Sequence, residues 1–189
     1  MDYIVRKARE SDNINIAKTI AYSFEKSFSV LTKDIKRMAK AVENGIVTDR
    51  FYVAEQNEIL IGVVGCGDCT GRVFKLIKDD FKKHLGSIRG QIAYKLLYPG
   101  LMRPHNYPAT TGYIDIIGVL QQARGKKVAK ELLNAVIENN PQYNEFILDT
   151  DSINASAIKS YTNFGFVEFK RWPDIKLIKR NKVFMKYTV

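Results

Sequence analysis

The segment of residues 113–138 contains residue types that could hold a phosphate group. Apolar residues over 113–119 predict a β-strand, and a glycine-containing basic run follows at 124–127. Apolar residues at helical spacing then predict a helix, and these are Val128, Leu132, Leu133 and Val136. The first N–H groups of a helix lack partners within it and lie at the positive end of its dipole. The pattern therefore predicts an anion site at this turn.

A second set of residues follows at a defined spacing. Asn154, Ala157, Tyr161, Gly165 and Phe166 form the pattern N-x-x-A-x-x-x-Y-x-x-x-G-F. The hydroxyl of a tyrosine, with an ordinary pKa near 10, can donate a hydrogen bond or a proton to a forming anion. The alternative is that Tyr161 only packs one face of its helix.

Together the two blocks resemble the GNAT superfamily of acetyl-CoA-dependent N-acetyltransferases. That family places R/Q-x-x-G-x-G/A at a pyrophosphate-binding turn and the second pattern on the following helix and strand. The second block matches at every position, whereas the first matches at Arg124 and Ala129 but has Lys127 where the family most often has glycine. The resemblance implies an α/β fold of the mixed α+β kind, with helices flanking a largely antiparallel central sheet. This is the GNAT-like acyl-CoA N-acyltransferase fold.

The resemblance also implies an activity. An acyltransferase of this type moves the acetyl group of acetyl-CoA to a primary amine of a small molecule or peptide, by direct attack in a ternary complex. Acetyl-CoA (coenzyme A) is then the donor substrate, and no metal is required. Two alternatives stay open: a non-catalytic acyl-CoA-binding regulatory protein, and a basic ribosome- or RNA-associated acetyltransferase.

The cofactor-binding residues are those that match the family's motifs. The pantetheine arm in the family runs beside the strand before the turn, and Asn154 would contact the cofactor where two central strands splay apart. If the backbone at Lys127 is helical, its side chain can turn outward, and we expect altered cofactor affinity rather than its loss. The expected cofactor-binding residues are Ile117, Gly118, Val119, Arg124, Gly125, Lys126, Lys127, Val128, Ala129, Lys130, Asn154, Ala157 and Tyr161.

Tyr161 is the expected general acid, since the family places this hydroxyl near the thiol sulfur. The sequence offers several general bases. Asp149 lies five residues before Asn154, where some family members carry a catalytic glutamate. Asp115 lies on the strand before the turn and could face the acceptor, and Glu55 is a third option. Each carboxylate could instead bind backbone amides or pair with lysine, and a water chain could replace all three.

The rest of the chain predicts the elements that position these groups. Strands are expected at residues 3–8, 145–150, 166–170 and 182–187, with a hairpin over 51–65. In the N-terminal part, Ser11 or Asp12 can cap one helix, and Thr32 can cap a second that Gly45 ends. In the family these helices wall the acceptor side.

A long helical stretch separates the hairpin from the strand at 113. Helical spacing is kept by Phe74, Ile77, Phe81, Leu85 and Ile88, and Pro99 is expected to close a further helical piece. We expect one domain, residues 1–189, with a helical insert at about residues 70–110. The insert could be a lid or acceptor wall, a packing element or a dimer contact.

The composition fits a folded basic protein. Thirty Lys and Arg against 20 Asp and Glu give a net charge of +10, which favours anionic ligands such as coenzyme A. Nucleic acid is a less favoured partner, because no RRM, KH or zinc-finger pattern is present. Cys66 and Cys69, with His84 and His105, lack the spacing of a zinc site, so we expect reduced thiols. With no signal-peptide pattern and no bilayer-length apolar run, we expect a cytoplasmic protein without a membrane partner, and a homodimer is left open.

Overall fold

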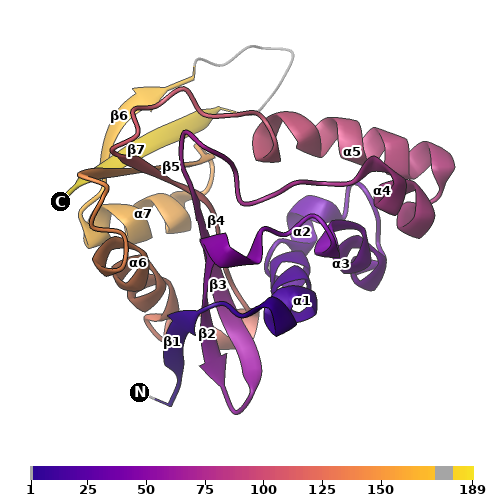
Figure 1. Ribbon diagram of the computed structural model, residues 1–189, viewed down its shortest axis with the longest axis horizontal. Coiled ribbons are helices and arrows are strands. Elements are labelled where there is room, and N and C mark those ends of the chain that lie inside the picture. The colour runs from indigo at the N-terminus through magenta and orange to yellow at the C-terminus, as the bar shows by residue number, and fades with distance from the viewer. Residues whose placement is uncertain (1, 173–180) are drawn as a thin grey trace.

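The computed structural model describes residues 2–172 and 181–189. They form a seven-stranded sheet with helices on both faces (Figure 1). The strand order is β1-β2-β3-β4-β5-β7-β6. Strands β4 and β5 run parallel, and every other neighbouring pair in this sheet is antiparallel. The predicted mixed fold with a largely antiparallel sheet is therefore confirmed.

The elements have the following bounds. The strands are β1 (Ile4–Lys7), β2 (Phe51–Gln56), β3 (Ile59–Gly67), β4 (Thr111–Val119), β5 (Glu145–Asp151), β6 (Val167–Arg171) and β7 (Lys182–Thr188). The helices are α1 (Asn13–Ser23), α2 (Glu25–Phe28), α3 (Ile35–Glu43), α4 (Lys78–Leu85), α5 (Ser87–Leu101), α6 (Val128–Glu138) and α7 (Ala155–Phe164). Short 3-10 turns lie at Glu10–Asp12, Thr48–Arg50 and Gln121–Ala123.

Each face of the sheet has its own apolar core. Helices α1 and α3, with Phe81 and Ala93 of the helical insert, pack one core, in which Ile16 and Met38 are fully buried. Helices α6 and α7 pack the other core through residues such as Leu132 and the motif residue Tyr161. The basic turn and the second motif of the sequence therefore lie on one face, and the insert lies on the other.

Several predicted element boundaries were wrong in the N-terminal half. The first helix breaks at Phe24 into α1 and α2. The Asp12 carboxylate makes no cap bond with α1, because it instead binds the Arg6 side chain and the Arg9 N–H. The cap of α3 is Asp34, whose side chain accepts from the Arg37 N–H at 3.1 Å, and not Thr32. Asp34 lies closer to the start of α3 than Thr32 and can take the cap in its place. The spacing of residues alone does not reveal which of two such side chains makes the cap bond.

The long stretch before β4 is helical, as its spacing predicted, but its limits differ. Phe74 lies outside the helices and bridges to Ile46 instead, and α4 begins at Lys78. Helix α5 continues through Pro99 and ends at Leu101, so this proline does not close it. Phe81 and Leu85 nevertheless point into the core, and the helical pattern there is confirmed.

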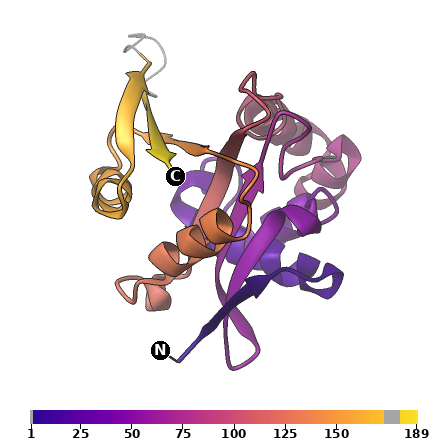
Figure 2. The ribbon, with the colours of Figure 1, turned by 60° about the vertical axis from the view of Figure 1, so that its left-hand side comes forward.

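The centre of the sheet opens between β4 and β5. The two strands pair from Thr111 with Glu145 to Ile114 with Leu148, and no further. Strand β5 stays paired with β7 as far as Asp151, so the separation arises on the β4 side. Figure 2 shows α7, β6 and β7 lying to one side of the other elements. The second half of β4 consequently has a free edge in the middle of the sheet.

A β-bulge lies where the two strands part. Gly65 of β3 pairs with Ile116, but the next residue, Cys66, pairs with Ile114, so Asp115 is an extra residue on β4. Ile114 faces the α6–α7 core and Ile116 faces the α1–α3 core. The bulge therefore changes which side chains of β4 face each core, and no residue pattern predicted it.

Candidate active site

The basic turn between β4 and α6 is held by two left-handed residues. Gly125 has φ +78° and Lys127 has φ +62°, ψ +8°. Glycine adopts such angles without strain, whereas a lysine in this region costs about 1–2 kcal/mol. The backbone at Lys127 is therefore not helical, so the condition under which this lysine was expected to be tolerated is not met. The left-handed backbone explains why glycine is favoured at the motif position that Lys127 occupies in this chain.

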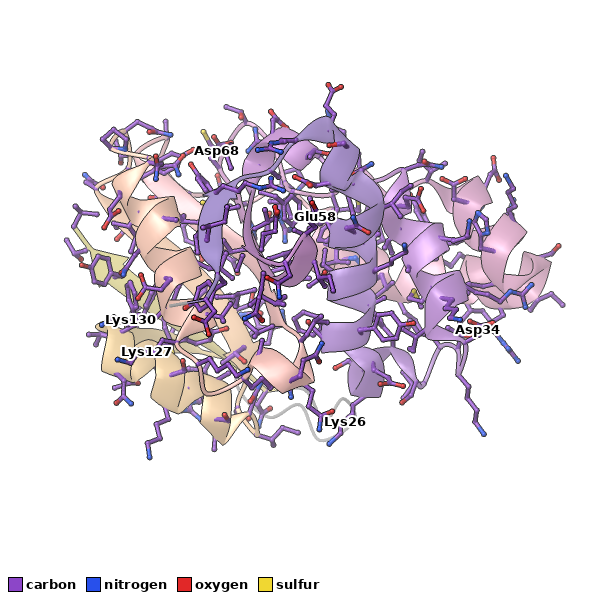
Figure 3. The ribbon with its side chains drawn as sticks, turned by 90° about the horizontal axis from the view of Figure 1, so that it is seen from below. Lys26, Asp34, Glu58, Asp68, Lys127 and Lys130 are labelled. Carbon is purple, nitrogen blue, oxygen red and sulfur yellow. The ribbon has the colours of Figure 1, made fainter. Side chains whose placement is uncertain are left out.

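This turn leaves a run of backbone donors free. None of the N–H groups from Gly125 to Lys130 makes a well-formed hydrogen bond with another described residue, and the first bond of α6 joins the Glu131 N–H to the Lys127 carbonyl. The side chains of Lys126, Lys127 and Lys130 are exposed. In Figure 3, Lys127 and Lys130 extend together from the start of α6 on one flank of the molecule. Free amides, a helix dipole and exposed ammonium groups together suit an anion.

The free edge of β4 adds further donors and acceptors. The Leu120 N–H donates to the Ile61 carbonyl of β3 at 2.9 Å. Because antiparallel pairing alternates, the peptide groups of Ile117 and Val119 turn away from β3, toward the open side. The Val119 carbonyl is already occupied, because it accepts a hydrogen bond from Arg124 Nε at 3.3 Å. An extended ligand chain could pair with the others as a strand would.

Arg124 and Asn154 both have structural contacts. A terminal nitrogen of Arg124 donates to the Ser23 carbonyl at 3.1 Å, so the side chain joins the end of α1 to the end of β4. The Asn154 side-chain oxygen caps α7 by accepting from the Ala157 N–H at 3.2 Å. Among the described residues the Asn154 side-chain NH₂ has no acceptor, so it remains able to donate.

Tyr161 lies on α7 with its ring in the α6–α7 core. It is 9% exposed, and its ring packs against Phe166 at a centroid distance of 6.1 Å. Burial, and to a lesser degree the charge of Asp149, raise the pKa of its hydroxyl above the ordinary value. The phenol is therefore protonated at neutral pH. It makes no hydrogen bond with any residue that the structure describes.

Asp149 lies on β5 immediately after the last residue paired with β4. One carboxylate oxygen accepts a hydrogen bond from the Tyr113 hydroxyl, and the other accepts one from the Lys182 ammonium. Burial, followed by the charge and the hydrogen bond of Asp149, raises the pKa of Tyr113. Both oxygens of Asp149 are thus occupied, in a charged cluster beside the opening of the strands.

The side chain of Asp115, the bulge residue, is fully buried and does not face an open space. Its carboxylate accepts from Arg72 Nε at 2.5 Å and from the Val73 N–H at 3.0 Å, while His105 Nε2 lies 3.2 Å away. Arg72 also donates to the carbonyls of Gly100 and Arg103, near the end of α5. These bonds attach the helical insert to the centre of β4.

An aromatic cluster covers this side of the strand opening. The rings of His105 and Tyr113 stack at a centroid distance of 3.4 Å, and Tyr107 lies 5.7 Å from Tyr113. Burial and the charges of Asp149 and Glu145 raise the pKa of Tyr107. His105 and Tyr107 come from the loop between α5 and β4, which therefore contributes side chains to the site.

Glu55 lies away from this opening, whereas Cys66 lies on β3 opposite Ile114, beside the bulge. Glu55 pairs with Arg6 at 2.5 Å on the β1–β2 side of the sheet. Cys66 and Cys69 are free thiols, and burial, followed by the charges of Asp115 and Asp68, raises the pKa of Cys66 to about 12. In Figure 3, Asp68, which precedes Cys69, lies toward the top of the view, and Lys127 lies toward the lower left.

Within residues 2–172 and 181–189, no cluster of three or more His, Cys, Asp or Glu side chains could hold a metal ion. None of the helices described there has the length and apolar character needed to cross a bilayer.

Sequence reasoning missed four residues of this site: Arg72, His105, Tyr107 and Lys182. They come from loops or from the start of β7 and follow no spacing rule. A weak signal existed, because His105 is one of two histidines in the chain and lies between Pro104 and Pro108.

Comparisons with known proteins agree with this architecture. Residues 21–166 match the sequence profile described as the acetyltransferase (GNAT) family, so the chain belongs to that family. The predicted family is thereby confirmed, and at the level of the family so is the class of enzyme, an acyltransferase.

Individual relatives are more distant. N-alpha-acetyltransferase 30 of Saccharomyces cerevisiae is 32% identical over 72 residues, a stretch that spans 37% of this chain and 41% of the yeast protein. An N-acetyltransferase from Staphylococcus aureus Mu50 has a TM-score of 0.65 at 18% identity, covering 97% of this chain and 100% of that one. A Salmonella typhimurium acetyltransferase solved with acetyl-CoA has a TM-score of 0.62 at 15% identity, covering 100% and 94%. At such identities the two structures show a shared fold.

Proposed function

We propose that this protein is an N-acetyltransferase that transfers the acetyl group of acetyl-CoA to a primary amine. The observation that carries the proposal is the run of free N–H groups from Gly125 to Lys130, in a basic turn next to the free edge of β4. The pyrophosphate would lie on these amides and the pantetheine arm along Ile117 and Val119. This arrangement would bring the thioester to the point where β4 and β5 part.

The acid role falls to Tyr161. The residue is buried, and its hydroxyl is protonated and has no partner among the described residues, which suits hydrogen bonding to a forming thiolate. A thiol has an ordinary pKa near 8.5, below that of this phenol. We therefore expect Tyr161 to stabilise the thiolate chiefly as a hydrogen-bond donor. The Asn154 NH₂ group would contact the cofactor nearby.

The acceptor class that the relatives favour is the amino group of a peptide or protein. The yeast relative is named as an N-alpha-acetyltransferase, and small-molecule amines are the alternative. Asp149 and its partners Tyr113 and Lys182 would line the acceptor side of the thioester.

Calorimetric titration with acetyl-CoA tests the donor site. We expect the wild type to bind acetyl-CoA, and we expect this binding to weaken when Lys126 and Lys130 are both changed to Glu. The wild type should also bind dephospho-CoA more weakly than it binds acetyl-CoA. Lys36→Glu, an exposed lysine on α3, is the matched control and should leave affinity unchanged. Thiol release would then be followed with peptides and small amines. Absence of acetyl-CoA binding would overturn the proposal, and binding without turnover of any amine would indicate a non-catalytic acyl-CoA-binding protein.

A further inference from the structure

The imidazole of His105 is held in a single defined position by groups on several elements. Its Nε2 lies 3.2 Å from an Asp115 oxygen, and its ring stacks on Tyr113. Asp115 is itself fixed by Arg72 and by the Val73 N–H. The Asp115 side chain is 0% exposed, that of Arg72 is 5% exposed, and that of His105 is 16% exposed. The histidine is therefore the member of this group that solvent or a ligand can reach.

The contact with Asp115 determines which ring nitrogen carries the proton. A carboxylate paired with a guanidinium accepts hydrogen bonds and has no proton to donate. At this contact Nε2 must therefore be the donor, so in the neutral imidazole the lone pair lies on Nδ1. Among the described residues, Nδ1 has no hydrogen-bond partner. A neutral imidazole whose other nitrogen is oriented by a carboxylate is an arrangement suited to accepting a proton.

His105 also lies on the appropriate side of the sheet. Ile114 and Leu148 face the α6–α7 core, which contains Tyr161. Their neighbours Tyr113 and Asp149 project from the opposite face, because side chains alternate along a strand. His105 stacks on Tyr113 and so shares that face. In a direct transfer the base must reach the attacking nitrogen and the acid must reach the departing sulfur. These are different substituents of the carbonyl carbon, so the base and the acid can come from different faces of the sheet.

We propose that His105, oriented by Asp115, is the general base that accepts the proton of the acceptor amine. This rests on the proposed acetyl transfer. An acceptor ammonium first gives one proton to Nδ1, directly or through one water. The N–C bond then forms while the C–S bond breaks. The nitrogen loses its second proton to solvent, and the thiolate, hydrogen-bonded by Tyr161, takes up one proton from solvent. The products are the amide, the thiol of coenzyme A and one released proton, which the imidazolium returns to solvent. Asp115 and Arg72 act as positioning residues.

Steady-state kinetics as a function of pH test this assignment, with the chain's other histidine as control. We expect His105→Gln to lower kcat by about 100-fold or more. It should flatten the dependence of kcat on pH and leave acetyl-CoA affinity unchanged. His84→Gln should match the wild type in every measurement. The titratable and charged groups that face His105 are Asp115, Arg72, Tyr107 and Tyr113, with Asp149 beyond Tyr113. The Tyr107→Phe variant shows how much the Tyr107 hydroxyl contributes to the dependence of kcat on pH.

A second measurement covers the case in which the variant does not fold. Nitrogen-15 shifts of the wild-type imidazoles, assigned with His84→Gln, should show the His105 proton on Nε2 and an unprotonated Nδ1. A proton on Nδ1, or a His105→Gln enzyme within about threefold of wild type, would overturn the proposal. Failure of the proposed function gives a different result, since the wild type would then release no thiol with any amine while the His105 tautomer remained as expected.

Discussion

The two sides of the β4–β5 opening are built in different ways. On the donor side, the basic turn and Tyr161 come from two short segments whose spacing follows the secondary structure. On the other side, Arg72, His105, Asp115, Asp149 and Lys182 come from five separate positions along the chain. The first set works largely through backbone amides, and the second through side chains that hold one another. A binding site for a constant ligand can be encoded locally, whereas the acceptor side is assembled by the fold.

The largest difference between the two sides should appear in stability. We expect Asp115→Asn to lower the free energy of unfolding by about 3–5 kcal/mol, because it leaves the buried Arg72 guanidinium uncompensated. Urea unfolding measures the loss. Glu168→Gln breaks an exposed ion pair with Arg171 and should produce a much smaller change. If the two variants lost similar stability, the acceptor side would not be the rigid network described here.

A donor-side change should affect rate rather than stability. We expect Tyr161→Phe to lower kcat by about 100-fold, since it removes the hydrogen bond to the forming thiolate. Acetyl-CoA affinity, measured by calorimetry, should be unchanged. Tyr187→Phe is the matched control, because Tyr187 also packs against Phe166. If kcat were unchanged in Tyr161→Phe, the hydroxyl would have no part in the reaction and the residue would only pack in the core.

The left-handed turn offers a smaller and opposite effect. Replacing Lys127 with glycine should raise the free energy of unfolding by up to about 1 kcal/mol, the relief of left-handed strain less the added chain entropy. Acetyl-CoA should bind at least as tightly. Lys126→Gly, at a residue without a positive φ, should give no such gain. Loss of both stability and affinity in Lys127→Gly would mean that the lysine side chain itself contributes to the site.

Alkaline pH should produce the smallest effect, shared by both sides. The pKa values of Tyr113 and Tyr161 are raised, mainly by burial, and that of Tyr143 is raised to about 12. The unfolded chain therefore loses these protons first as the pH rises above about 10. Stability conferred by the neutral phenols is complete below that pH and declines above it. Ultraviolet titration should show late-ionising phenols in the folded protein that ionise near pH 10 in urea, and Tyr113→Phe and Tyr161→Phe should each remove one.

Much of the fold could be predicted because its signals are local. Alternation and apolar runs located the strands, and the Val128–Val136 spacing located α6. Errors occurred where two neighbouring groups compete, as at the α3 cap, or where a helix continues through a residue that usually ends one, as at the exposed Pro99 in α5. The β-bulge at Asp115 could not be foreseen, since it depends on the register between β3 and β4.

The sequence by itself determined the family and the position of the basic turn. A turn that leads from a strand into a helix always leaves the first N–H groups of that helix without partners, so the local pattern is sufficient to locate it. The sequence also determined that Tyr161 and Asn154 share one element. The tertiary structure decided what surrounds them. It gave Lys127 its left-handed backbone, buried Asp115 beneath Arg72 and brought His105 onto Tyr113. Such contacts join residues far apart along the chain, and their geometry exists only after the strands have paired and the cores have closed.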